Sequence, residues 1–378
     1  AGVEKTFDSQ LQDPAYSKNP LKLTIDLSIQ AAVEHVLEGG MRLLNAKGAA
    51  AILMEVETGR IISLASLPDF DPNHRPKLPS RGSAEESPLF NKAIQGVYEL
   101  GSTFKIFTVA QALELGLVDP KTKINTKGPI RIGGHKINDY RSNGPELPVW
   151  EIITESSNLG TARIAKMIGP EKQREFLSSL GFSKPTTIEM IEANGGKPLL
   201  PKRWNELETM TISYGHGLSA TPLHLATGYA TLANGGRLVN PTLLQEVKPV
   251  LGPRVISKEV AENSLAMLRG VVTGGTASLA DVDGYFVGGK TGTADKPSSQ
   301  GGYDKEKNIT NFASIFPINE PKYVLVVTLD EAQDTSGPEP KRTAGWTAVP
   351  VSAEIIARVA PLLGLRPKFD NHSTIGIT

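Results

Sequence analysis

A short stretch from Tyr98 to Gly116 places a serine and a lysine at the start of an apolar helical pattern. Gly101 permits a tight turn before that pattern begins. Ser102 and Lys105 are three residues apart, so on a helix they share one face. Burial lowers the pKa of a lysine, and a neutral amine can take the proton of a serine hydroxyl. The stretch therefore predicts an activated serine nucleophile, although a capping serine beside a solvated lysine would give the same spacing.

Two further motifs follow this stretch in the chain. The first is Ser156-Ser157-Asn158, and the second is Lys290-Thr291-Gly292-Thr293. Alone, the first would be a local turn and the second an edge strand weakened by glycine. The Ser-x-x-Lys and Lys-Thr-Gly patterns each occur once in the chain. A second Ser-x-Asn, at Ser17, lies upstream in a polar stretch and so has the wrong order. The three motifs in this order predict distant segments that converge on one cleft.

Composition excludes several classes of protein. The 378 residues carry 40 basic and 40 acidic side chains, and this balance argues against a partner such as nucleic acid. There is no cysteine, so no disulfide framework or thiolate metal site is expected. The chemistry of the motifs calls for no metal and no cofactor. No apolar run is long enough to span a bilayer, so no membrane anchor is expected within this sequence.

The periodic segments predict an α+β fold, with five mostly antiparallel strands between helices and an inserted helical subdomain at roughly 110–280. The five strands are expected at 49–56, 60–66, 285–294, 308–316 and 323–330. Helices are expected at about 26–45, 102–116, 148–165, 172–180, 258–271 and 347–363, with an Ala/Leu-rich helix ending at Asn234. A short extra strand is expected at 21–25, and irregular structure at 119–144. The helical pattern at 148–165 is expected to break near Ser156 and Asn158.

The domain boundaries follow from where these patterns begin and end. Residues 1–20 are polar and without period, and are expected to form a linker or the remnant of a preceding domain. Residues 21–366 are expected to form the catalytic domain, and 367–378 a C-terminal tail. His216 stands in a glycine-rich loop, where a structural role is expected because no serine and aspartate are suitably spaced for a triad.

At these motifs the chain resembles the penicillin-recognising serine transferases, a family that combines Ser-x-x-Lys, a Ser-x-Asn type motif and Lys-Thr-Gly. It is most similar to the transpeptidase domain of class B penicillin-binding proteins, including members that act in cell division. The resemblance runs from about Leu21 to Leu363. It includes further stretches at 69–73, 98–101, 214–223 and 343–348. The chain departs from the usual pattern at Leu100 and Ala332, where the family often has proline.

The resemblance implies a fold of the penicillin-binding and serine β-lactamase type and a role for each motif residue. Ser102 would attack the peptide stem of peptidoglycan at D-Ala-D-Ala and form an acyl-enzyme, with Lys105 as general base. Ser156 would relay a proton, and Lys290 would lower the pKa of Lys105. The remaining motif residues would hold the substrate: Asn158, Thr291, Gly292 and Thr293. The backbone N–H groups of Ser102 and Thr293 would form the oxyanion hole.

The resemblance also implies partners and a location. β-Lactams would acylate the same serine, and a septal glycosyltransferase and other cell-division proteins would be partners at the periplasmic face of the inner membrane. Three alternatives remain open from the sequence: a serine β-lactamase, a D,D-carboxypeptidase and a penicillin-binding sensor. A β-lactamase often uses a dedicated carboxylate. Glu189 and Glu192 lie in the intervening region, without matching the usual loop.

Overall fold

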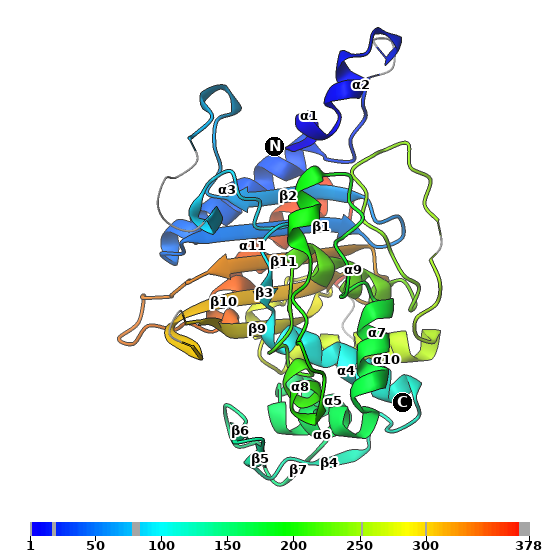
Figure 1. Ribbon diagram of the computed structural model, residues 1–378, viewed down its shortest axis with the longest axis vertical. Helices are drawn as coiled ribbons and strands as arrows, with labels where there is room; N and C mark the ends of the chain where they lie inside the picture. The colour runs from blue at the N-terminus through cyan, green and yellow to red at the C-terminus, as the bar shows by residue number, and fades with distance from the viewer. Residues whose placement is uncertain (1, 17–19, 78–83, 251, 299–300, 370–378) are drawn as a thin grey trace.

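A central antiparallel sheet of five strands organises the computed structural model, which describes residues 2–16, 20–77, 84–250, 252–298 and 301–369 (Figure 1). The strand order is β2-β1-β11-β10-β9. The bounds are Gly48–Glu55 for β1, Ile61–Leu67 for β2, Gly288–Pro297 for β9, Tyr303–Phe316 for β10 and Tyr323–Asp330 for β11. All five predicted strands are confirmed. Strand β10 begins five residues earlier than expected, because it continues as a ribbon with the extended end of β9.

Helices cover both faces of this sheet. Helices α3 (Leu27–Leu43) and α11 (Ala348–Leu362) pack together on one face, and α9 (Pro222–Ala233) lies against the other (Figure 1). Every residue of α9 is buried, which explains its Ala/Leu-rich sequence without a polar side. Helix α10 (Lys258–Thr273) packs against β9. Strand β1 is buried along almost its whole length, whereas side chains of the edge strand β2 alternate between buried and partly exposed.

A helical part that follows residue 104 forms the lower part of the molecule in Figure 1. Its helices are α4 (Lys105–Glu114), α5 (Val149–Thr154), α6 (Asn158–Ile168), α7 (Pro170–Ser179) and α8 (Glu206–Ile212). The expected helix 148–165 is therefore two helices, interrupted near Ser156 as the sequence indicated. The limits of this part as a subdomain remain a prediction.

The segment expected to be irregular, 119–144, contains short strands instead. Strand β4 (Lys123–Asn125) pairs with β7 (Glu146–Pro148), and β5 (Ile130–Ile132) pairs with β6 (His135–Ile137). A further two-residue pair joins β3 (Tyr98–Glu99) to β8 (Ser219–Ala220). Three residues are too few to show an alternating pattern, which is why the sequence did not reveal these strands.

A small hydrophobic cluster supports the β5–β6 ribbon and is separate from the main core. Its buried members come from β6, α6, α8 and the loop after α8: Ile137, Leu159, Ala162, Met210 and Tyr214. The main cluster extends from α3 through the sheet to α11 and also contains Phe104, Ile106 and Phe107 around α4. Within the helical part, α4 thus packs into the large cluster, whereas β6 and α8 pack into the small one.

The ends of the chain differ in part from expectation. Residues 2–16 contain short helices, α1 (Gly2–Thr6), α2 (Asp8–Gln12) and the 3-10 turn Pro14–Tyr16; α1 and α2 contain no buried residue. The strand expected at 21–25 is wrong, because Leu23 forms only an isolated bridge to Leu244. Most of the expected tail, 370–378, lies outside the described residues. Among the described residues, no helix combines the length and apolar character needed to cross a membrane.

Candidate active site

Ser102 lies in a 3-10 turn, Gly101–Phe104, that leads directly into α4 at Lys105. The sequence placed Ser102 at the start of an α-helix; the tighter turn replaces that first turn, and the Lys105 N–H donates to the Ser102 carbonyl. Gly101 has a φ of +59°, and a Cβ there would lie 2.8 Å from the Thr293 carbonyl oxygen. A glycine is therefore required for β9 to approach the nucleophile so closely.

Lys105 is fully buried, and its amino group meets Ser156 rather than solvent. The Lys105 Nζ donates to Ser156 Oγ at 2.9 Å and also to the Ser156 carbonyl oxygen. Burial, reinforced by the neighbouring Lys290, holds the pKa of Lys105 well below its ordinary value. A buried lysine whose pKa is lowered in this way is available as a neutral amine, which is the form that accepts a proton.

Residues 156–158 form the turn between α5 and α6, here called the 156–158 turn. Ser156 has a φ of +59°, a region that non-glycine residues seldom adopt. Ser157 caps α6 by accepting from the Gly160 N–H. Asn158 begins α6, and its Nδ2 donates to the Asn138 carbonyl oxygen at 3.0 Å. The turn therefore points the Ser156 hydroxyl at Lys105, while Asn158 remains partly exposed.

Lys290 reaches the same place from the sheet. It is fully buried on β9, and burial lowers its pKa to about 7. Its Nζ donates to the Thr291 carbonyl oxygen at 3.4 Å. Gly292 faces residues 100–103, and a Cβ at Gly292 would lie 2.2 Å from the Leu100 carbonyl oxygen. The structure thus brings together three motifs that are spread along the sequence from 102 to 293.

The hydroxyl groups of the two threonines of β9 have hydrogen-bond partners on neighbouring segments. Thr291 Oγ1 is 2.7 Å from Thr276 Oγ1, and Thr293 Oγ1 accepts from the Ala344 N–H at 3.0 Å. Because Thr293 accepts this bond, its own hydroxyl proton is left for a ligand. Such donors beside Lys290 suit a carboxylate.

Sequence reasoning did not find every residue that shapes this site. Asp139 follows β6 and accepts hydrogen bonds from Ser157 Oγ and the Leu159 N–H. Thr276 follows α10 and touches Thr291. A lone aspartate and a lone threonine in loops carry no motif signal, so only the tertiary structure shows their contacts.

His216 lies beside the site but without a catalytic partner among the described residues. Its ring centroid is 5.3 Å from that of Tyr214 and 5.8 Å from that of Tyr303. Burial lowers the pKa of His216. Glu99 accepts from the Gly217 N–H and from the Tyr303 hydroxyl, so this loop is held against the segment before Ser102. A structural role for His216 remains the prediction.

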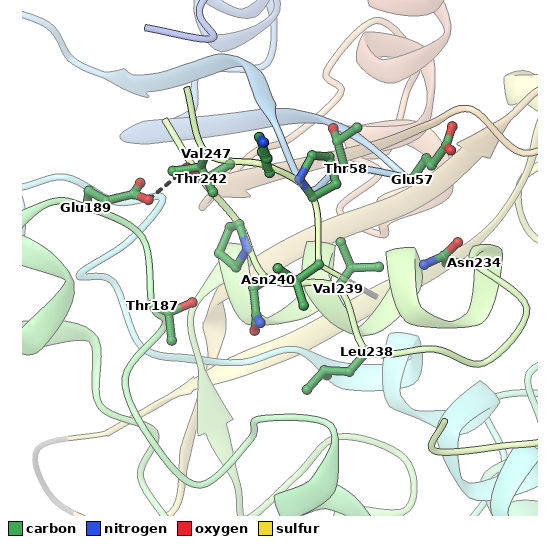
Figure 2. A pocket seen from close by; sticks show the side chains of 14 residues that line it. Glu57, Thr58, Thr187, Glu189, Asn234, Leu238, Val239, Asn240, Thr242 and Val247 are labelled. Carbon is green, nitrogen blue, oxygen red and sulfur yellow. Dashed lines mark hydrogen bonds between the residues drawn. The ribbon is translucent and has the colours of Figure 1, made fainter. Parts of the chain in front are cut away.

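The two glutamates considered as β-lactamase bases are bound elsewhere. Glu189 accepts from Thr242 Oγ1 at 2.7 Å and from the Leu243 N–H at 2.9 Å. Figure 2 shows Glu189 at the edge of a pocket that none of the predicted site residues line. Glu192 accepts from the Gly2 N–H. Neither carboxylate therefore faces an ester formed at Ser102.

Comparison with known proteins agrees with this geometry. The family model described as "Penicillin binding protein transpeptidase domain" matches residues 49–356. The chain therefore belongs to the penicillin-binding protein transpeptidase family.

Individual relatives support the same assignment. The chain is 34% identical to the probable peptidoglycan D,D-transpeptidase FtsI of Caulobacter vibrioides, over 97% of this chain and 63% of that protein. It is 31% identical to the probable peptidoglycan D,D-transpeptidase PenA of Neisseria flavescens, over 99% of this chain and 91% of that protein. It thus spans less than two thirds of the Caulobacter relative.

The fold is shared with a solved transpeptidase domain. The apo structure of that domain from Burkholderia pseudomallei penicillin-binding protein 3 matches with a TM-score of 0.80 and 32% identity, covering 94% of this chain and 99% of the other. The predicted α+β fold is confirmed by this match and by the sheet order.

Proposed function

We propose that the chain is the catalytic domain of a peptidoglycan D,D-transpeptidase. The observation that carries the proposal is the fully buried Lys105, with its lowered pKa, hydrogen-bonded to Ser156 and beside Lys290. A serine three residues before this amine has a base and a proton relay within one cleft. The relatives described above are transpeptidases by their printed names.

In the first half-reaction, Ser102 Oγ attacks the carbonyl carbon of the penultimate D-Ala. Lys105 takes the serine proton, and Ser156 passes a proton to the leaving amine as the peptide C–N bond breaks. The backbone N–H groups of Ser102 and Thr293 hold the developing oxyanion. The closeness of Gly101 to the Thr293 backbone supports this pairing.

In the second half-reaction, an amine of another stem peptide attacks the acyl carbon. The bond to Ser102 Oγ breaks, and the proton lost by the amine returns to the serine through the same relay. Before acylation, Thr291 and Thr293, with Lys290, hold the terminal carboxylate of the donor, which then leaves with the terminal D-Ala. Strand β9 lies at the edge of the sheet, where an extended peptide can align along it. Asn158 holds the stem peptide from the opposite wall.

The wider role follows from the FtsI relatives and is part of the proposal. The substrate is the stem peptide of septal peptidoglycan, and β-lactams acylate the same serine. The domain works at the periplasmic face of the inner membrane beside a glycosyltransferase and other division proteins.

Intact-mass measurement after addition of benzylpenicillin tests the reaction. We expect one adduct of the mass of the drug, located at Ser102, and no adduct on Ser102→Ala. Lys105→Arg should slow acylation by about a hundredfold or more, because arginine stays protonated and cannot act as base. Ser179→Ala, an exposed serine on α7, is the matched control. An adduct on Ser102→Ala, or wild-type rates in Lys105→Arg, contradicts the assignment.

The same sample separates a transpeptidase from a β-lactamase. Glu189 and Glu192 are held elsewhere, so neither of them activates water against the ester. The adduct should last from many minutes to hours. Rapid, repeated release of hydrolysed penicillin would instead make the chain a β-lactamase.

A further inference from the structure

A two-residue segment, Asn138–Asp139, holds the 156–158 turn from outside. Asp139 Oδ2 accepts from Ser157 Oγ at 2.7 Å, and its Oδ1 accepts from the Leu159 N–H at 2.9 Å. The neighbouring Asn138 carbonyl oxygen accepts from Asn158 Nδ2 at 3.0 Å. Three hydrogen bonds thus connect this segment to residues that directly follow Ser156.

The turn needs such support because Ser156 is in an unfavourable backbone conformation. A φ of +59° at a serine persists only where the surrounding structure fixes it. On the α5 side, the Ser156 and Ser157 N–H groups donate to Ile153 and Ile152. On the α6 side, Asp139 supplies the anchor. With both sides held, the Ser156 hydroxyl stays within hydrogen-bond distance of Lys105 Nζ.

Asp139 also carries a negative charge whose field reaches Lys105. The positive groups around Lys105 are Lys290 on β9 and, when protonated, His216 in the loop before β8. Burial and Lys290 lower the pKa of Lys105, and Asp139 acts in the opposite direction. Arg163 on α6 lies in the field of the same carboxylate, since Asp139 raises the Arg163 pKa against the effect of its burial.

We propose that Asp139 is a positioning residue for acylation: its oxygens hold the 156–158 turn against Lys105, and its charge acts on the Lys105 amino group. This inference rests on the proposed function, in which Lys105 takes the Ser102 proton. It adds to that function a residue outside the three motifs. This residue lies two positions after the β5–β6 ribbon.

Two substitutions separate the position of Asp139 from its charge. Asp139→Asn keeps one acceptor oxygen and the shape of the side chain but removes the charge. Asp139→Ala removes both. Asp119→Asn is the matched control, because Asp119 accepts from the Lys121 and Thr122 N–H groups in an exposed turn of the same region.

The measurement is the rate of benzylpenicillin acylation of the full chain across a range of pH. In Asp139→Asn the acidic limb of the pH–rate profile should move to lower pH, by about 0.5 pH unit or more. A lysine that loses a nearby negative charge gives up its proton more readily. In Asp139→Ala the plateau rate should fall by about tenfold or more, because the turn is released. Asp119→Asn should match the wild type in both respects.

The outcomes are distinct. A limb in Asp139→Asn that stays at the wild-type pH, or moves upward, overturns the role of the charge. A wild-type plateau in Asp139→Ala overturns the positioning role. A lower melting temperature with an unmoved limb and plateau would show a purely structural residue and would also overturn the inference. Failure of the wild type to form any adduct at Ser102 would instead sink the proposed function.

Discussion

The two walls of the candidate active site are built differently. One wall consists of β9 and of segment 101–105, which joins the main core at Phe104; Lys105 and Lys290 are fully buried there. The other wall is the 156–158 turn, which donates hydrogen bonds to the Asn138–Asp139 segment and rests on a cluster of five buried side chains.

Under the proposed function, the two walls meet two different requirements. A general base with a lowered pKa needs deep burial, which only a large core can provide at this depth. A proton relay must be held at hydrogen-bond distance but does not need the same burial. The first wall should therefore tolerate almost no change in volume, and the second should absorb such a change with smaller loss of activity.

The largest expected effect is at the closest contact of the first wall. Gly292→Ala places a Cβ only 2.2 Å from the Leu100 carbonyl oxygen. Relief of that clash would displace segment 101–105 or β9, so acylation by penicillin should fall by about a hundredfold. The free energy of unfolding should fall by about 1–3 kcal/mol. Gly39→Ala on α3, where a Cβ meets no atom within 4 Å, is the control. Wild-type acylation in Gly292→Ala would show that this wall is adjustable.

A smaller effect is expected from Lys290→Met, which keeps much of the volume and removes the charge. The positive charge of Lys290 lowers the pKa of Lys105, so its removal should raise that pKa. Less neutral Lys105 is then present at a given pH, and the acidic limb of acylation should move to higher pH. If the limb moves by a full pH unit, the rate below its midpoint should fall by about tenfold. Stopped-flow acylation across pH checks this, and a limb that moves downward would mean that Lys290 does not act through Lys105.

The smallest effect on catalysis is expected in the second wall. Met210→Ala opens a cavity in the five-residue cluster and should lower the free energy of unfolding by about 2–5 kcal/mol. Because the hydrogen bonds that Asp139 accepts still hold the turn, the acylation rate should fall only a few fold while the protein remains folded. Denaturant unfolding and acylation on the same sample make the comparison. A hundredfold loss of acylation, equal to that of Gly292→Ala, would erase the proposed difference between the walls.

Much of this molecule could be predicted from the sequence, because local patterns carry local structure. The strands and most of the helices that pack on the sheet follow from periodicity, and the motif at Ser102, taken together with the two motifs that follow it, indicated a candidate nucleophile and its base. The break near Ser156 was also visible. The strand expected at 21–25 failed because Leu23, with an alternating pattern around it, has only Leu244 as a bridge partner.

The sequence by itself determined which chemical groups are present and the order in which they occur. The tertiary structure decided which of them meet. The burial that lowers the pKa of Lys105 arises from packing of β9, α4 and the 156–158 turn, and no window of sequence contains these three segments. Asp139 and Thr276 have no motif, yet each touches a site residue that is 15 or more positions away. Such contacts depend on how distant segments fold together, because the strength of electrostatic and hydrogen-bond interactions is set by distance and burial rather than by position in the chain.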